Sequence, residues 1–227
     1  MSSKTYQLQS SGSHAEPAGT ADAQRSRSLV RASGLACIAG ALITAVGGAV
    51  SQVVRASTSV SPEVWSFPWT SETFVAISLL WSVSHVLVLI GLLGLGRSGV
   101  AGPSRMAKVG VGIALTGTLL LLAGELAGLP VRDADFDSSG VALVGALFGF
   151  GTLLSAIGLL AAGRATLKAR LWGGWRRFVP LLAGVWAVVL IALPATAVIS
   201  AGVGVFGLCF LALGVALYTQ PSPRAQL

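Results

Sequence analysis

Six long apolar stretches, separated by short segments that hold almost all of the charged residues, constrain the fold of this chain more than any other feature. Each stretch supplies about 20 residues, the length that an α-helix needs to cross roughly 30 Å of hydrocarbon. Of the 227 residues, 54% are hydrophobic and only 10% are charged, whereas a soluble domain carries about a quarter charged residues. The sequence therefore predicts an all-α integral membrane helix bundle with six transmembrane helices.

The apolar runs place the spans and the domain boundaries. The predicted spans are about 33–54, 73–95, 107–129, 140–162, 176–195 and 197–218. They form one transmembrane domain, 31–219, between a polar tail, 1–30, expected to be disordered in the cytoplasm, and a short cytoplasmic tail, 220–227. The last two spans share one run that is too long for a single helix, and Pro194 near its middle predicts a tight turn. One helix kinked at Pro194 plus a re-entrant segment is the alternative.

The basic residues of the connecting segments predict the orientation. Arg and Lys are frequent before the first span and in the second and fourth loops, and scarce in the other loops. Because basic loops stay on the cytoplasmic side, both termini are predicted to be cytoplasmic. Arg far outnumbers Lys, and Ala, Gly, Val and Leu dominate, which is typical of a GC-rich bacterial genome. The predicted location is a bacterial inner (cytoplasmic) membrane.

The net charge of +7 is explained by these span-flanking residues. No basic stripe with interleaved aromatic residues lies outside the spans, so nucleic acid is not a predicted partner. The predicted partners are the lipid bilayer and anionic lipid at the basic inner loops, above all the segment 164–178, which mixes Arg and Lys with Trp172, Trp175 and Phe178. Docking of a cytoplasmic protein on this segment is the alternative.

Small residues recur at four-residue spacing in three spans, where they allow helix backbones to approach closely. The sets are Gly40, Thr44 and Gly48; Gly124 and Gly128; and Gly145 and Gly149. Packing within the bundle is the favoured interpretation, and a homo-oligomer formed through one of these faces is the alternative.

Three polar residues form the candidate intramembrane site. Glu125 is the only acidic residue within a predicted span. A carboxylate in the bilayer centre costs roughly 2.5–3.5 kcal/mol on insertion scales, so we expect Glu125 to face the bundle interior, to hold a proton or to reach the interface. His85 lies near the middle of the second span, with Ser82 one turn before it. Helix rise separates Glu125 and His85 by roughly 10 Å in depth, so a direct contact is not expected.

Catalytic and cofactor motifs are missing from the sequence. There is no HExxH, CxxC, phosphate-binding loop or GxSxG, and Asp133, Asp135 and Asp137 lack the glycine and glutamate of a calcium loop. We therefore predict no enzyme, cofactor or metal site. Two functions remain open: a small permease-like transporter with a polar site at Glu125 and His85, and a non-catalytic structural or interaction subunit without a transport pathway. The direction in which Glu125 and His85 point distinguishes them.

Overall fold

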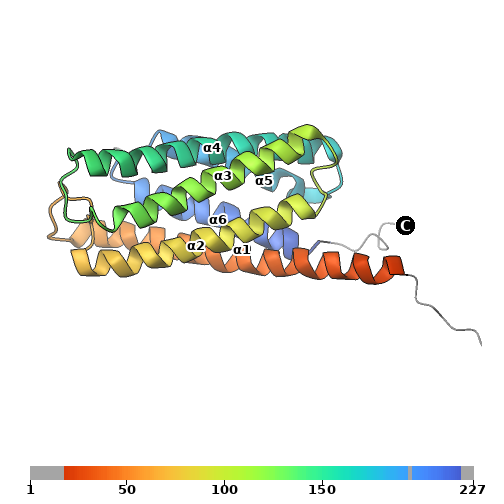
Figure 1. Ribbon diagram of the computed structural model, residues 1–227, viewed down its shortest axis with the longest axis horizontal. Coiled ribbons are helices and arrows are strands. Elements are labelled where there is room, and N and C mark those ends of the chain that lie inside the picture. The colour runs from red at the N-terminus through yellow and green to blue at the C-terminus, as the bar shows by residue number, and fades with distance from the viewer. Residues whose placement is uncertain (1–17, 194–195, 221–227) are drawn as a thin grey trace, which may run out of the picture.

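The computed structural model describes residues 18–193 and 196–220, and helices joined by loops make up this part of the chain, with no strand (Figure 1). The helices are α1 (Ala18–Ser57), α2 (Ser71–Arg97), α3 (Arg105–Gly128), α4 (Ser139–Ala169), the 3-10 helix η1 (Gly174–Phe178), α5 (Val179–Ile191) and α6 (Ile199–Tyr218). Six candidate spans are long and apolar enough to cross a membrane, η1 and α5 counting together as one. The predicted all-α bundle of six transmembrane helices is confirmed.

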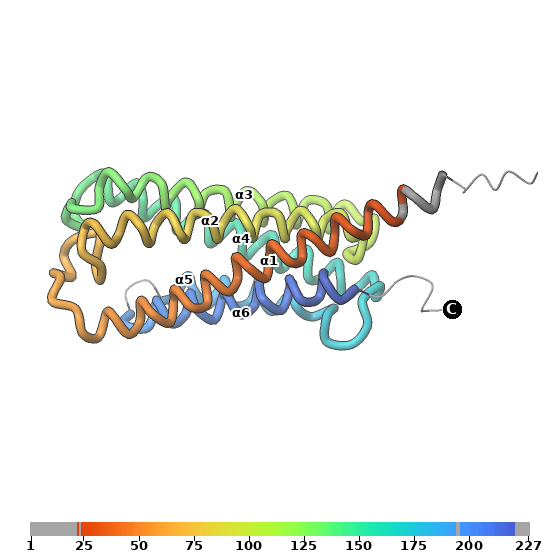
Figure 2. Tube along the Cα trace, turned by 90° about the horizontal axis from the view of Figure 1, so that it is seen from below, coloured from red at the N-terminus to blue at the C-terminus, as the bar shows by residue number. Residues whose placement is uncertain are grey.

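The six α-helices form a closed ring. Each packs against its neighbours along the chain, and α6 returns to pack along α1 (Figure 2). The start of α1 and the end of α6 consequently lie at the same end of the bundle, where the Arg31 guanidinium is 5.0 Å from the centre of the Tyr218 ring.

Three of the helices begin where a hydroxyl side chain accepts a hydrogen bond from a backbone N–H of the first turn, at Thr70, Ser104 and Ser138.

The two ends of the ring differ in charge. One end, which we call the basic end, is formed by the 98–104 loop, the segment 170–178 and the adjoining helix turns. It carries Arg97, Arg105, Lys108, Arg164, Lys168, Arg170, Arg176 and Arg177. The opposite end, which we call the cap end, has Arg55 and Arg132 as its basic residues in the described part of the chain. The alternation of basic-rich and basic-poor loops thus becomes a separation of charge between two faces of the bundle.

The connection between the last two spans agrees with two helices. α5 ends at Ile191 and α6 begins at Ile199, and the helices pack together, with the Trp186 Nε1–H donating a 2.8 Å hydrogen bond to the Gly202 carbonyl. A single kinked helix is therefore excluded. Pro194, where the turn is predicted, lies outside the described residues.

Two terminal predictions are only partly covered by the structure. Helix α1 begins at Ala18, so the chain is already helical within the predicted tail 1–30. Ala, Gln and Arg in this segment are good helix formers, and a helix nucleated in the span extends through them at little cost. Residues 1–17 and 221–227 lie outside the described part.

The three aromatic residues predicted to meet lipid in the segment 164–178 differ in exposure. Trp172 is buried, at 2% exposure, whereas Trp175 and Phe178 are 50% and 40% exposed, so only the latter two can contact headgroups.

The outward faces of the helices are apolar along their length. On α2 the exposed large side chains are Leu79, Leu80, Val83, Val86, Ile90 and Leu93. A continuous apolar surface of this extent suits acyl chains as its solvent rather than water. The polar groups of the α2 backbone are meanwhile satisfied inside the helix, as hydrocarbon requires.

Glycines produce the closest helix contacts, between α3 and α4. A Cβ on Gly110 would lie 2.7 Å from the Ala162 nitrogen, and one on Gly158 would collide with the backbone of Ala114. Because lipid supplies no hydrophobic force between helices, this backbone proximity is a main source of association. Helix α4 thus uses Gly151 and Gly158, seven residues apart, to face α3.

The predicted small-residue faces behave differently from one another. Gly40 packs against α2 and Gly48 against α6, while Gly124 and Gly128 meet the rings of Phe148 and Trp65. Gly145 and Gly149 have no neighbour within 4 Å of their added Cβ positions, so for this pair the predicted packing within the bundle is wrong. Gly145 and Gly149 lie on a different side of α4 from Gly151 and Gly158, which face α3, and therefore point away from the bundle.

The two classes of glycine on α4 predict opposite effects of the same substitution. We expect Gly158→Ala to lower the free energy of unfolding by about 1–3 kcal/mol, because its methyl group overlaps the α3 backbone. Gly149→Ala, in open space, should leave stability unchanged or slightly raised. Unfolding in mixed detergent–dodecyl sulfate micelles measures both, and equal stability of the two variants would contradict this packing.

Candidate functional site

A cavity of about 170 Å³ lies inside the ring, and all six α-helices contribute to its wall. The lining residues are Thr44, Trp81, Ser84, His85, Val88, Thr118, Leu121, Glu125, Phe148, Thr152, Leu190, Val203, Phe206 and Phe210. Liquid water occupies about 30 Å³ per molecule, so the space is comparable to five or six waters. Counted by helix rise, it lies within roughly 20 Å of the cap end.

Glu125 and His85 line this one cavity although they come from different helices. Glu125 is on α3, one turn before its end, and His85 is near the middle of α2. The Ser78 hydroxyl, on α2, is within reach to donate a hydrogen bond to the Glu125 carboxylate. The depth difference is bridged by the cavity itself, which extends along the helices, and a direct Glu125–His85 contact is not needed.

The Glu125 carboxyl group has no cationic side chain beside it. Among residues 18–193 and 196–220, Arg132 and Asp133, in a loop at the cap end, make the one ion pair, at 3.5 Å. An ionised carboxylate in an apolar interior without a partner is costly. A proton or a bound cation therefore has to offset the charge of Glu125.

Hydrogen bonding fixes which His85 nitrogen carries a proton. Nδ1 lies 2.8 Å from the Trp81 carbonyl oxygen, and a carbonyl can only accept. Nδ1 is therefore the donor, and in the neutral ring Nε2 is left as an acceptor. No bond from Nε2 to another described residue is present, so the cavity offers an imidazole lone pair as well as a carboxylate.

The hydroxyl groups of the cavity also present acceptor oxygens. Thr118 and Thr152 donate to carbonyls one turn back in their own helices, at 3.0 Å and 2.8 Å, which leaves their lone pairs uncommitted. Thr44 and Ser84 bond to each other across α1 and α2 at 2.6 Å, and Ser84 also donates to the Gly40 carbonyl. The polar part of the wall is therefore suited to a ligand that donates hydrogen bonds.

Ser82, the third residue of the predicted site, does not line the cavity. It is buried, and its hydroxyl donates to the Ser78 carbonyl at 2.8 Å. Ser84, two residues later, lines the cavity in its place. Thr44, Thr118 and Thr152 were missed as site residues. Comparing the depth of hydroxyl residues across all six spans, rather than around His85 alone, would have indicated them.

Aromatic rings form much of the remaining wall. Phe206 and Phe210 stack edge to face, with 4.9 Å between ring centres, and Trp81 and Phe148 come from α2 and α4. The faces of aromatic rings attract cations. A cavity with a carboxylate, several acceptor oxygens and four such rings favours a small cation over an anion.

Two loops close the cap end above the cavity. The segments 58–70 and 129–138 pair through their backbones: Trp65 N–H donates to the Ala134 carbonyl at 3.0 Å, and Phe136 N–H donates to the Glu63 carbonyl at 2.9 Å. The Arg132 side chain secures the second segment to the start of α2, with a 2.7 Å bond from Nε to the Ser71 hydroxyl. We call this pair of segments the cap.

Trp65 connects the cap to the cavity. Its ring packs against Phe136 of the cap, 5.6 Å between centres, and against Phe148, at 6.1 Å, which lines the cavity. Its Nε1 lies against Gly128, one turn beyond Glu125 on α3, and is buried without a hydrogen-bond partner. The indole ring thus lies between Phe136 of the cap and Phe148 of the cavity wall.

The three aspartates of the second cap segment do not gather into one cluster of side chains. Within the described ranges, no group of three or more His, Cys, Asp and Glu side chains could hold a metal ion. Comparison with known proteins found no matching family model, no similar curated protein and no similar solved structure.

If Trp65 closes the cavity, removing its ring should expose the cavity wall to reagents from the cap end. We expect Thr118→Cys, with Cys37 and Cys209 replaced by Ala, to react slowly with a membrane-impermeant methanethiosulfonate. Adding Trp65→Ala should accelerate that labelling at least tenfold, whereas Trp175→Ala, an exposed ring at the basic end, should not. Equal labelling rates in both double variants would show that the cap does not control access.

Proposed function

We propose that this chain is a small membrane transporter that binds a small organic cation, of the ammonium class, in the cavity between its helices. The observation that carries the proposal is that Glu125 and His85 line one cavity built from all six helices. Glu125 is the counter-ion, His85 Nε2 and the threonine oxygens accept hydrogen bonds, and the aromatic rings line the rest of the space around the cation. The volume of about 170 Å³ favours a solute of a few non-hydrogen atoms.

The chemistry of Glu125 supports exchange with protons. A carboxyl group without a partner in the bundle holds either a proton or the bound cation, because leaving both absent is costly. A cation that enters therefore displaces a proton, and a proton that returns releases the cation. Binding of the two at one residue couples their movements in opposite directions.

The half of the bundle toward the basic end is closed by packed side chains. Leu92, Leu95, Leu213 and Leu217 are each at most 1% exposed there. The cavity is thus nearer to one face of the bundle than to the other, and the cation would have to pass this layer to complete transport. Rearrangement of α2 and α6, which carry these leucines, is the proposed conformational step.

The separation of charge supports an orientation and a location. We propose that the basic end, with both termini, faces the cytoplasm of a bacterial cell and that the cap faces outward across the inner membrane. The cation would then enter from outside or be released there.

A second candidate is a non-catalytic interaction subunit, which the outward face of α4 favours. Ala142, Gly145, Ala146 and Gly149 are all exposed on this face. Small residues at four-residue spacing allow another transmembrane helix to pack closely. This function needs no transport pathway, so a flux measurement distinguishes it from the first.

Proteoliposomes containing trapped pyranine test the transporter proposal. With a panel of small amines, from methylamine to tetramethylammonium, we expect at least one cation to move faster than in protein-free liposomes, with protons moving oppositely. Glu125→Gln should slow this at least tenfold, because a neutral amide cannot serve as the counter-ion. Glu72→Gln, an exposed carboxylate at the cap end, is the matched control and should retain the wild-type rate. Equal rates for wild type and Glu125→Gln, or no cation moved, would refute the proposal.

Reporter fusions in a bacterial host test the orientation. We expect green fluorescent protein fused after Leu227 to fluoresce, and alkaline phosphatase inserted after Ser61, in the first cap segment, to be active. Phosphatase active after Leu227 would place the basic end outside and reverse the proposed orientation.

A further inference from the structure

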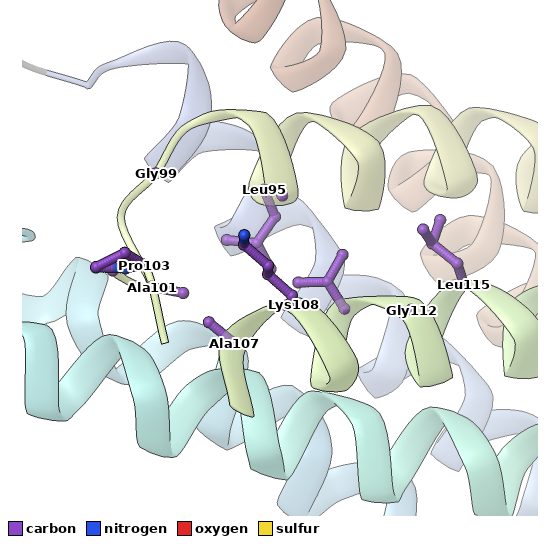
Figure 3. Close-up of a pocket in the computed structure, with 11 residues that line it drawn as sticks. Leu95, Gly99, Ala101, Pro103, Ala107, Lys108, Gly112 and Leu115 are labelled. Atoms are coloured by element: carbon purple, nitrogen blue, oxygen red, sulfur yellow. The ribbon is translucent and has the colours of Figure 1, made fainter. Parts of the chain in front are cut away.

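A second, larger hollow lies at the basic end and shares no residue with the cavity of Glu125 and His85. It is a groove of about 570 Å³ between the end of α2 and the start of α3, beneath the 98–104 loop (Figure 3). Its lining residues are Leu95, Gly96, Gly99, Ala101, Gly102, Pro103, Ala107, Lys108, Val111, Gly112 and Leu115. Its volume lies within the range of roughly 300–1,000 Å³ that is usual for ligand sites.

Small residues keep the groove open. An added Cβ on Gly112 would meet no atom within 4 Å, and one on Gly96 would meet only Val111, at 3.3 Å. The wall then continues to Leu115, which lies about 15 Å along α3 from its first residue. The groove thus has a mainly apolar wall that extends along α3 from the 98–104 loop to Leu115.

One cationic side chain reaches into this apolar groove. Lys108, on the first turn of α3, extends across the gap toward Leu95 of α2 (Figure 3). Arg97 and Arg105, which end α2 and begin α3, are exposed on either side of the loop. The sequence from Gly96 to Leu115 contains no acidic residue, and none of the three cations makes an ion pair with another described residue.

We propose that this groove binds one anionic phospholipid, with an acyl chain along Val111, Gly112 and Leu115 and the phosphate at Lys108. The apolar wall and the lysine at its mouth match the two parts of such a lipid. The depth also agrees, because Lys108 lies about 5 Å along α3, near the membrane surface, and the wall continues into the acyl region. Basic residues beside a membrane are attracted to anionic headgroups, and Arg97 and Arg105 add to that charge.

Native mass spectrometry of the intact chain, released from nanodiscs of equal parts phosphatidylglycerol and phosphatidylcholine, tests the proposal. We expect one phosphatidylglycerol to remain bound per wild-type chain and phosphatidylcholine to be lost. Gly112→Leu should lower the retained lipid at least tenfold, because the added side chain occupies the groove, where its Cβ meets no atom within 4 Å. Lys108→Gln should weaken retention about fivefold, as expected for one basic residue near an anionic surface.

Matched variants separate a specific groove from general lipid adhesion. Gly149→Leu adds the same side chain at another open glycine, and Lys168→Gln removes an exposed charge from the same end of the bundle. Both should retain phosphatidylglycerol as the wild type does. A melting temperature for Gly112→Leu within a few degrees of wild type would show that the loss of lipid does not come from unfolding.

Two results would overturn the proposal: equal retention of the two lipids by the wild type, or equal retention by Gly112→Leu and Gly149→Leu. If Gly112→Leu also lowers the melting temperature, the lysine pair decides: phosphatidylglycerol retention by Lys108→Gln equal to that by Lys168→Gln overturns the proposal. None of these outcomes depends on cation flux, so the groove and the transporter proposal can fail separately.

Discussion

Lipid offers the polypeptide backbone no hydrogen-bond partner, and this constraint underlies every other feature of the structure. It requires the spanning segments to be helices, so that each backbone N–H and C=O is paired within its own segment. It also removes the hydrophobic force between helices, so the ring holds together where glycines let backbones meet, as at Gly110 and Gly158. Few polar side chains lie within the spans, so the polar groups around Glu125 and His85 mark their cavity as the candidate functional site.

The bundle can be divided along its length into three layers. A packed leucine layer occupies the basic half, the cavity follows, and the cap covers it with the Trp65 ring. Glu125 is part of the cavity wall, one turn before the cap-side end of α3. Because the carboxylate lies in a small cavity lined by hydrogen-bond acceptors, the free energy of ionising it depends on what occupies that cavity.

Hydropathy was sufficient to predict the six helices, because solvent preference acts on each span separately. The candidate residues Glu125 and His85 were predicted from rarity alone, and the structure brings them to one cavity. Their shared wall was not predicted, since depth counting ignores the direction of side chains around each helix. For the same reason Ser82 was predicted to belong to the site, whereas Ser84 lines the cavity. Gly145 and Gly149 were likewise predicted to pack within the bundle, although they point away from it. Rotation is set by contacts between helices, which one sequence does not report.

Main-chain atoms supply the hydrogen bonds that join the two segments of the cap. The carbonyls of Glu63, Arg132 and Ala134 accept these bonds, and any amino acid at those positions carries the same carbonyl. The Trp65 and Phe136 rings also pack across the join, so an exposed side chain such as that of Glu63 can be exchanged without loosening it, whereas the two rings cannot. The exposed surface of the cap can therefore change its charge while the hydrogen-bonded join beneath it is kept.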